Sequence, residues 1–342
     1  MKTLIAPLLA ALALPSFAGE PAGTTFTHHD WELVCDNTRT CRAAGYQADD
    51  AEPAVSVLLE RQAGPGQPVK ARMRLGSYDP EAPVPKGGVV TMKIDGHTEG
   101  QVKIDRKEML GILSAAQTQA LVAAVAGTGK VEWTNGSHAW KLSGKGASAV
   151  LLKMDEAQGR LGTPGALLRK GSKAEDAVPG PLPAPEVSPA SAGSTEVDLP
   201  ATARATLLAE LRKKLGADSD GCEAFAPDQL TVLRLNADKL LVQMPCWTGA
   251  YNQGTAFLLA NKNPPFNLKM ITGDGTDYAA GTIMSSQKGR GLGDCWAHEK
   301  LVWDGRRFVV TETATTGMCK LVAPGGAWHL PSYVAKVTRG LR

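Results

Sequence analysis

The sequence has few aromatic residues and lacks the short motifs that mark common catalytic sites. Trp, Tyr and Phe make up 5% of its 342 residues. It contains no Cys-x-x-Cys, no His-x-x-x-His and no Gly-x-Ser-x-Gly segment. These absences argue against a dithiol redox site, a zinc site and the nucleophile turn of an α/β-hydrolase. We therefore predict no metal, no cofactor and no catalytic set.

The chain also lacks an excess of charge of either sign. Its 37 Lys and Arg residues nearly balance 34 Asp and Glu residues, which leaves a formal charge of +3. Basic pairs such as Arg169-Lys170 and Arg306-Arg307 are scattered along the chain. A nucleic-acid-binding protein concentrates basic residues on one face, so we expect no nucleic-acid partner.

Only the first residues form a long apolar run. Lys2 precedes an uncharged stretch over residues 4–14, and Ser16-Phe17-Ala18 places small residues where a signal peptidase reads them. This pattern predicts a signal peptide over residues 1–18, cleaved after Ala18. The run is too short to cross a bilayer, and no other apolar stretch of about 20 residues follows. We expect a periplasmic or secreted protein with no membrane span.

The cysteine count fits an oxidising compartment. Six cysteines in an exported chain indicate disulfides. A proline-rich segment separates Cys35 and Cys41 from the other four, so these two are expected to pair. Three pairings remain for the second group. We favour Cys222–Cys246 and Cys295–Cys319, because each pair flanks an expected hairpin.

Composition changes sharply between residues 174 and 203. Prolines spaced by two favour an extended spacer over packed structure; they are Pro179, Pro181, Pro183 and Pro185, with Pro189 and Pro200 further along. We interpret this segment as a linker between a domain at 19–173 and a domain at 204–342.

Strand patterns dominate both predicted domains. The Asn135-Gly136 dipeptide predicts a two-residue hairpin turn that pairs Trp133 with His138. Asp105 and Ser114 each begin a capping-box pattern. Helices are expected at 115–126, 147–158 and 203–215. The prediction is an α+β, β-rich fold, in which each domain is a mostly antiparallel sheet or sandwich with a few short helices.

Three segments resemble catalytic or ligand motifs but fit turns better. Ser285-x-x-Lys288 lacks the helix and the Lys-Thr-Gly segment that accompany it in penicillin-binding enzymes. Gly289-x-Gly291-x-Gly293 leads into Cys295 and a strand, where a phosphate loop needs a helix. The acidic segment 274–277 lacks the terminal Glu of a calcium-binding loop.

Several stretches taken together resemble known bacterial families. The opening Phe26-x-x-x-Asp30-Trp31-x-x-x-Cys35-Asp36, with Cys41-Arg42-Ala43, is similar to the invasion-associated locus B proteins. Further segments of this kind are Met154-Asp155-Glu156-x-Gln158-Gly159-Arg160, Gly291-x-Gly293-Asp294-Cys295-Trp296 and Trp303-Asp304-Gly305. All of these segments together resemble the exported two-part proteins of domain-of-unknown-function family 1176. The resemblance implies a β-rich envelope or secreted module that meets a partner, and it supplies no catalytic residues.

The leading hypothesis is a non-enzymatic protein that binds a protein or an envelope component. Trp296, Trp328 and Tyr333 are the candidates for an exposed interaction surface, against a core-packing interpretation. One alternative is a cell-wall hydrolase, with Asp274, Asp277, Asp294 and His298 as the residues to test; it requires convergent carboxylates or a Ser/His pair within about 3 Å. Another is an inhibitor of a foreign hydrolase acting through a rigid loop at 287–293. The ligand and the oligomeric state stay open.

Overall fold

The computed structural model describes residues 23–217, 222 and 227–338. The predicted signal peptide lies outside these residues. Within the described part of the chain, strands predominate and are accompanied by three α-helices. Nearly all strand pairs are antiparallel, which confirms the predicted β-rich α+β class. No helix among the described residues is long and apolar enough to cross a membrane.

Residues 23–173, here called the N-terminal half, form one large antiparallel sheet and two helices. The sheet has ten strands in the order β1-β2-β3-β4-β5-β8-β7-β6-β9-β10. The first five strands are β1 (Thr24–His28), β2 (Trp31–Cys35), β3 (Cys41–Tyr46), β4 (Val55–Arg61) and β5 (Lys70–Leu75). The others are β6 (Val89–Ile94), β7 (His97–Asp105), β8 (Leu110–Ile112), β9 (Val131–Thr134) and β10 (Ala139–Leu142).

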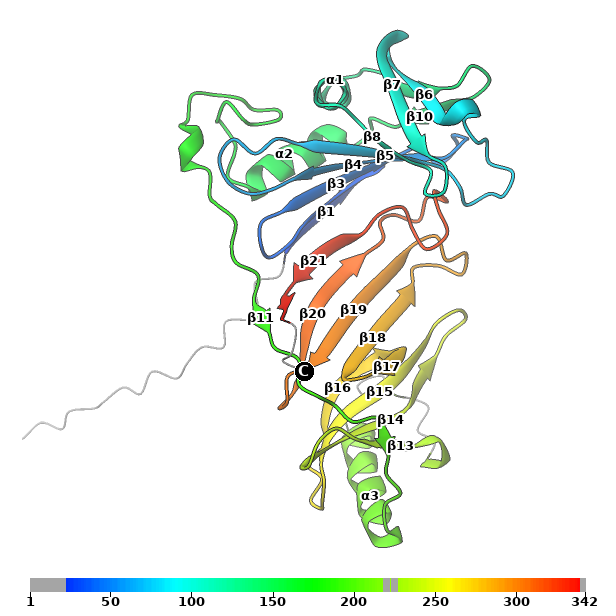
Figure 1. Ribbon diagram of the computed structural model, residues 1–342, viewed down its shortest axis with the longest axis vertical. Helices are drawn as coiled ribbons and strands as arrows, with labels where there is room; N and C mark the ends of the chain where they lie inside the picture. The colour runs from blue at the N-terminus through cyan, green and yellow to red at the C-terminus, as the bar shows by residue number, and fades with distance from the viewer. Residues whose placement is uncertain (1–22, 218–221, 223–226, 339–342) are drawn as a thin grey trace, which may run out of the picture.

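The two helices of this half, α1 (Ala115–Ala126) and α2 (Ala147–Ala157), cover one face of the sheet (Figure 1). Alternate residues of the strands point toward them, as the period of two in a strand requires. The core of this half contains Trp31, Leu33, Val57, Leu59 and Met73 from the strands, with Leu121, Val125, Val150, Leu151 and Met154 from the helices. Both helices lie where the capping and glycine signals predicted them.

The Ser114 capping box is confirmed, because its Oγ accepts from the Gln117 backbone and the Gln117 side chain accepts from the Ser114 backbone. The Asp105 pattern is not a helix start. Asp105 ends β7, and its Oδ1 accepts the N–H groups of Lys107 and Glu108 in a turn that leads to β8. The same local hydrogen bonds thus stabilise a turn, since too few residues separate the two strands for a helix.

The register predicted for the hairpin near Asn135, in which Trp133 pairs with His138, is wrong. Trp133 pairs with Trp140, and Thr134 with Ala139. His138 lies in the turn, where its N–H donates to Oδ1 of Asn135 and the Asn135 N–H donates to its carbonyl. The loop between the paired residues Thr134 and Ala139 therefore has four residues, where the sequence predicted two.

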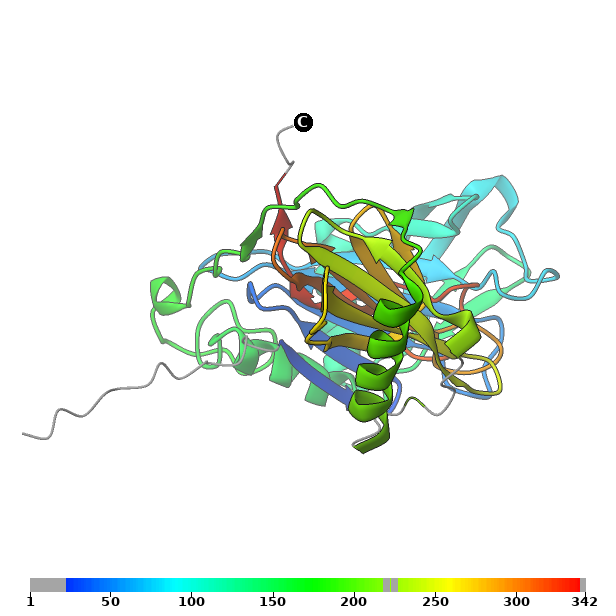
Figure 2. The same cartoon turned by 90° about the horizontal axis from the view of Figure 1, so that it is seen from below.

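The C-terminal half, residues 195–338, contains two stacked five-stranded sheets. One contains β12 (Thr195–Glu196), β13 (Thr231–Arg234), β14 (Lys239–Thr248), β15 (Gln253–Asn261) and β16 (Lys269–Gly275). The other contains β17 (Asp277–Ala279), β18 (Thr282–Lys288), β19 (Trp296–Trp303), β20 (Phe308–Thr315) and β21 (Leu330–Val334). Helix α3 (Ala201–Ala217), predicted at 203–215, lies against the outer face of the first sheet (Figure 2).

Two apolar layers hold this half together. Leu207 and Leu211 of α3 pack on Val242, Met244 and Leu258. Between the sheets, the layer contains Leu241, Phe257, Ile283, Leu301, Trp303 and Phe308. The predicted disulfides Cys35–Cys41, Cys222–Cys246 and Cys295–Cys319 are all present.

The two halves pack against each other (Figure 1). The loop after β20 fills the second face of the N-terminal sheet, where Val34, Ala44, Tyr46 and Leu58 contact Val322, Ala327, Trp328 and Leu330. Polar contacts surround this cluster. The ammonium group of Lys320 donates to Oδ1 of Asp30 at 2.7 Å, and the side chain of Asn37 exchanges two hydrogen bonds with the backbone of Val334.

The segment predicted to be a linker runs along both halves. The Leu182 N–H donates to the Thr38 carbonyl, and the Ala190 N–H donates to the Trp303 carbonyl. Its strand β11 (Glu186–Val187) pairs in parallel with β22 (Lys336–Val337). Its role as a spacer between independent domains stays a prediction.

A buried carboxyl group lies at the centre of the junction. Oε1 of Glu32 accepts the Tyr46 hydroxyl at 2.6 Å and the Met318 N–H at 2.8 Å. Burial raises the pKa of Glu32 above its ordinary value of 4.5, although these two hydrogen bonds oppose the change. The Glu32 carboxyl group therefore joins the Tyr46 hydroxyl of the N-terminal half to the Met318 N–H of the C-terminal half, at the cost of burying a charge.

Replacing Glu32 should separate these two contributions. Glu32→Ala leaves the Tyr46 hydroxyl without its acceptor and the Met318 N–H with only its 3.1 Å contact to the Tyr46 oxygen, and we expect a loss of about 2 kcal/mol in the free energy of unfolding. Glu32→Gln keeps the accepting oxygen, so it should retain most of that stability. Urea unfolding at fixed pH measures both.

The pH dependence of the Glu32→Gln effect has a definite sign. The folded wild type binds a proton at Glu32 more readily than the unfolded chain, so this group lowers stability as the pH rises above about 4.5. The glutamine variant lacks this group. Its stability relative to the wild type should therefore increase from pH 4 to pH 7, and an unchanged difference would contradict the assignment.

Candidate functional site

A loop that joins β18 to β19 lies where the two halves meet; we call residues 289–294 the braced loop. The Ser285-x-x-Lys288 segment before it is strand, and the glycine-rich segment is a turn, as predicted. The Gly289 N–H donates to the Cys295 carbonyl, and the Gly293 N–H donates to the Arg290 carbonyl. A Cβ atom on Gly289 would lie 2.7 Å from Sγ of Cys295, so only glycine fits this close approach.

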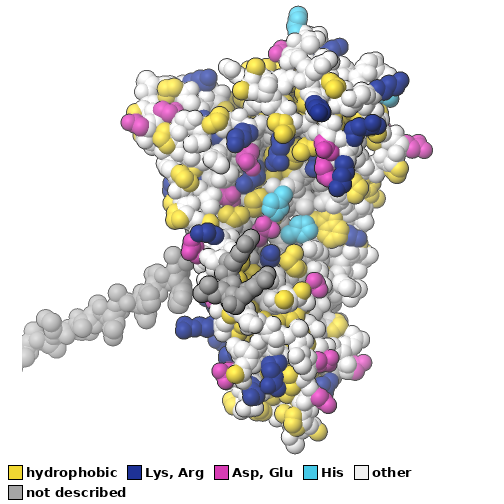
Figure 3. All heavy atoms as spheres, viewed as in Figure 1, with side chains coloured by type: hydrophobic (Ala, Val, Ile, Leu, Met, Phe, Trp, Pro, Cys, Tyr) yellow, Lys and Arg dark blue, Asp and Glu magenta, His cyan; other side chains and the backbone are white. Residues whose placement is uncertain are grey.

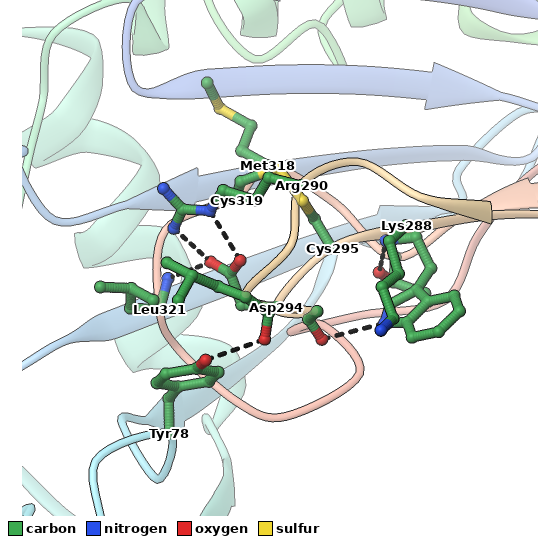
Figure 4. Close-up of a disulfide and its surroundings, with 12 residues drawn as sticks. Tyr78, Lys288, Arg290, Asp294, Cys295, Met318, Cys319 and Leu321 are labelled. Atoms are coloured by element: carbon green, nitrogen blue, oxygen red, sulfur yellow. Dashed lines mark hydrogen bonds and ion pairs between the residues drawn. A yellow bond between two sulfur atoms is a disulfide. The ribbon is translucent and has the colours of Figure 1, made fainter. Parts of the chain in front are cut away.

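An ion pair inside the loop fixes its shape. Arg290 donates from Nε and Nη2 to the two carboxylate oxygens of Asp294, at 2.8 and 2.6 Å, and the Leu321 N–H donates to Oδ2 of the same group (Figure 4). Asp294 is 1% exposed. Burial alone would raise its pKa, but the hydrogen bonds from Arg290 and Leu321 outweigh burial and lower it. The carboxylate thus stays ionised as a structural anchor.

Contacts from outside also hold the loop. The Tyr78 hydroxyl, from the N-terminal half, donates to the Leu292 carbonyl at 2.8 Å (Figure 4). The Gly293 carbonyl accepts Nε1 of Trp296 at 2.9 Å and the Gly325 N–H at 3.0 Å. Immediately after the loop, the Cys295–Cys319 disulfide ties it to the junction segment. Both halves of the molecule therefore fix its conformation.

Large apolar side chains are exposed around this loop. Leu292 at its tip is 55% exposed, Tyr251 is 47% exposed and Leu321 is 39% exposed. The ring of Tyr251 approaches Gly291, and Leu321 contacts Asp294 through its backbone. Within the described residues, seven large apolar side chains are exposed, and three of them belong to the braced loop or to residues that contact it.

A hollow lies on each side of the braced loop. A cleft of about 630 Å³ at the junction is lined from the N-terminal half by Tyr78 and Asp79, and from the C-terminal half by Arg290 and Lys320. On the other side, a groove of about 360 Å³ is lined by residues that include Tyr251, Lys288 and Trp296. Both volumes fall within the range of small-ligand pockets.

A histidine-containing strip lies on the outer face of the β17–β21 sheet. Oγ of Ser286 lies 3.0 Å from Nδ1 of His298, and the His298 ring is parallel to the Trp296 ring with 6.1 Å between centroids. His329 contacts Glu312 at 3.2 Å. Burial, and then the neighbouring His329, lower the pKa of His298. Two neighbouring histidine side chains are visible near the middle of the face in Figure 3.

The Ser286–His298 distance meets one requirement of the hydrolase alternative, but the residues named for it do not converge. Asp294 is bound to Arg290, Asp274 accepts Nε1 of Trp247, and Asp277 is exposed on β17. In the described part of the chain, no carboxylate hydrogen bonds to His298. A Ser/His pair without a group that orients the imidazole lacks the arrangement of a hydrolytic triad.

One group of potential metal ligands occurs among the described residues. Asp294, Cys295 and Cys319 place ligand-type atoms within 4.8 Å of one another. Both sulfur atoms belong to the disulfide, so neither supplies the thiolate that binds a metal.

The three residues predicted for an interaction surface lie in different surroundings. Trp328 is 6% exposed in the junction cluster, and Tyr333 is 7% exposed on β21. Both are buried, and packing of the two halves covers Trp328. Trp296 is half-buried beside the braced loop, so its role in binding stays a prediction.

The loop could be predicted from the sequence, but the residues that contact it could not. Of the segment 287–293, predicted as a rigid loop near Cys295, residues 289–293 lie in the braced loop, whereas Gln287 and Lys288 end β18. Tyr78, Tyr251 and Leu321 come from distant positions, so no local pattern indicated them. The spacing of Arg290 and Asp294 within a glycine-rich turn was the signal that could have indicated an internal ion pair.

Comparisons with known proteins give a family of undefined function. Residues 25–335 match the family described as "Protein of unknown function (DUF1176)". The chain is also 25% identical over 335 residues to "Uncharacterized protein YpfG" of Escherichia coli (strain K12), and the match covers 91% of each chain. No solved structure matches. The likeness to invasion-associated locus B proteins stays a prediction.

Proposed function

The chain belongs to the family described as protein of unknown function (DUF1176), and we propose that it is a non-enzymatic envelope protein that docks a partner protein around the braced loop. One observation carries this proposal. Leu292, Tyr251 and Leu321 expose apolar surface around a loop that both halves hold rigid.

The composition of this surface supports protein binding. Interfaces are enriched in Tyr, Trp and Arg, and their strongest contributors cluster at a well-packed centre. Arg290 lies in the same loop as the exposed Leu292, and Tyr251 and Trp296 line the groove beside that loop. A loop that is already ordered loses little conformational entropy when a partner binds, which favours affinity.

Export to the periplasm is part of the same proposal. The leader pattern over residues 1–18 and the three disulfides support an oxidising compartment. The partner is then a protein of the bacterial envelope or a secreted protein that reaches it.

A hydrolase inhibitor is a narrower form of this proposal. A preformed loop with an exposed apolar tip is suited to enter the active-site cleft of an enzyme. Slowing of a wall-degrading enzyme by the wild type and not by Leu292→Asp would support this form. The hydrolase alternative receives less support, because its named residues are dispersed.

Site-specific photocrosslinking tests the proposal. Leu292→p-benzoylphenylalanine is placed in the full chain, leader included, and adducts are sought in the periplasmic fraction of living cells. We expect a discrete adduct with one protein. With the partner identified, Leu292→Asp should weaken binding by at least tenfold, about 1.4 kcal/mol, because it places a charge in the apolar centre of the interface.

Ile112 provides the matched control. It is 74% exposed on β8 and lines neither hollow beside the braced loop, so the same probe there reports nonspecific contact. Identical adducts at both positions, or no adduct at Leu292, would refute docking at the braced loop.

A further inference from the structure

The groove beside the braced loop is open to solvent and has its own chemistry. It lies between the β14–β15 loop and strands β18 and β19, and its volume is about 360 Å³. It shares Tyr251 and Trp296 with the proposed docking surface, whereas Leu292 does not line it.

Hydrogen bonds between side chains and backbone groups give the groove its shape. Asn252 accepts the Lys288 N–H at Oδ1 and donates from Nδ2 to the Lys288 carbonyl, both at 2.9 Å. Nε2 of Gln287 donates to the Gln253 and Asp274 carbonyls. These bonds join the β14–β15 loop to the edge of β18, so the two walls stay at a fixed separation without a ligand.

Two aromatic rings line the groove. Tyr251 is 47% exposed, and Trp296 is held in place by the hydrogen bond from its Nε1 to the Gly293 carbonyl. Rings of this kind combine an apolar face with a polar edge. The C–H face of a sugar ring packs on such a surface.

Hydroxyl and amide groups make up most of the remaining lining. In the part of the chain that the structure describes, the side chains of Thr248 and Gln253 make no hydrogen bond within the protein. Both are therefore available to the hydroxyl groups of a ligand. Aromatic faces together with free hydroxyl and amide groups favour a saccharide over an apolar ligand.

The charge of the lining is one-sided. Lys288 is the charged residue among those that line the groove, and no carboxylate is among them. Its Nζ lies 5.4 Å from the centroid of the Trp296 ring, and among the described residues it forms no ion pair. An ammonium group over an aromatic ring is already oriented, so an anionic group on the ligand can pair with it.

We infer that this groove binds an anionic saccharide, one that carries a carboxylate or a phosphate. The sugar ring packs on the exposed ring of Tyr251, its hydroxyl groups bond to Thr248 and Gln253, and its anionic group lies against Lys288, which the Trp296 ring holds in place. This inference goes beyond the proposed protein partner, and Leu292, which does not line the groove, distinguishes the two.

Titrations with purified oligosaccharides test the inference. The probes are a trigalacturonate for the carboxylate, a phosphorylated maltotriose for the phosphate, and maltotriose as the neutral match, each followed by NMR or calorimetry at low salt. We expect one of the two acidic probes to bind at least tenfold tighter than maltotriose. Which of them does so identifies the anionic group.

Matched variants locate the binding. Lys288→Gln should remove the preference for acidic sugar, and Tyr251→Ala should weaken every saccharide at least tenfold. Tyr251→Phe keeps the ring and should bind as the wild type does. Lys153→Gln on α2 and Leu292→Asp should leave saccharide binding unchanged, and the second of these separates this site from protein docking.

Three results would overturn the inference. They are equal affinity for acidic and neutral probes, an acidic preference that survives in Lys288→Gln, and no binding of any probe up to about 10 mM. Thermal melts of each variant show whether a loss reflects unfolding.

Discussion

Replacing Arg160 with methionine should lower the free energy of unfolding by about 3–5 kcal/mol, because removing one member of a buried ionic network leaves its partners uncompensated. Arg160 is completely buried. Its guanidinium donates to Oε1 of Gln158, to Oε1 of Glu175 and to the carbonyls of Gln62 and Gly64. Methionine fills similar volume but supplies none of these donors.

The network around Arg160 extends into the core. Arg61 lies 3.7 Å from Oδ1 of Asp155, and burial lowers the pKa of Arg61 to about 10. Oδ2 of Asp155 accepts the N–H groups of Leu167 and Leu168. The network thus joins α2, β4 and the chain after α2, so its loss should affect the whole N-terminal half.

Urea unfolding followed by circular dichroism measures the Arg160 effect. Arg169→Ala is the control, since Arg169 is exposed and should change stability by less than about 0.5 kcal/mol. An Arg160→Met variant as stable as this control would mean that the network contributes nothing.

The second large effect is expected at Trp328. Its ring lies in the junction cluster, its Nε1 donates to Oγ of Ser56 at 2.7 Å, and the guanidinium groups of Arg72 and Arg74 lie 5.7 and 5.6 Å from its centroid. Trp328→Ala removes all of these contacts. We expect a loss of about 3–5 kcal/mol.

The loss should also change how the molecule unfolds. In the wild type the junction couples the halves, so we expect one calorimetric transition. In Trp328→Ala the coupling is weakened, and two transitions should appear. Trp328→Phe keeps an aromatic ring and loses the bond to Ser56, so it should cost about 1 kcal/mol. A single unshifted transition in Trp328→Ala would contradict this role for the junction.

Local chemistry explains what could be predicted. Helix α1 begins at the Ser114 box and ends before Gly127, and both signals lie within the helix and its immediate neighbours. The disulfide pairs Cys222–Cys246 and Cys295–Cys319 followed from the hairpins that they flank. The Asn135 hairpin shows the limit, because its turn dipeptide predicts a tight register, whereas the structure pairs the fully buried Trp133 and Trp140 with each other.

The resemblance motifs also have a structural explanation. Asp155 and Arg160 belong to the buried network, and Asp294 anchors the braced loop. Both sets hold chain segments together. Their residue types resemble those of catalytic sites, since buried charges occur in both settings.

The sequence by itself determined the β-rich class and the helices, because each depends on residues close together in the chain; it favoured one of three sulfur pairings in the second half, and the structure decided among them. Only the tertiary structure decided that Trp328 and Tyr333 are covered and that Leu292 and Tyr251 are exposed. Burial of a side chain depends on which distant segment packs on it, and the packing of the two halves joins residues nearly 300 positions apart, such as Asn37 and Val334.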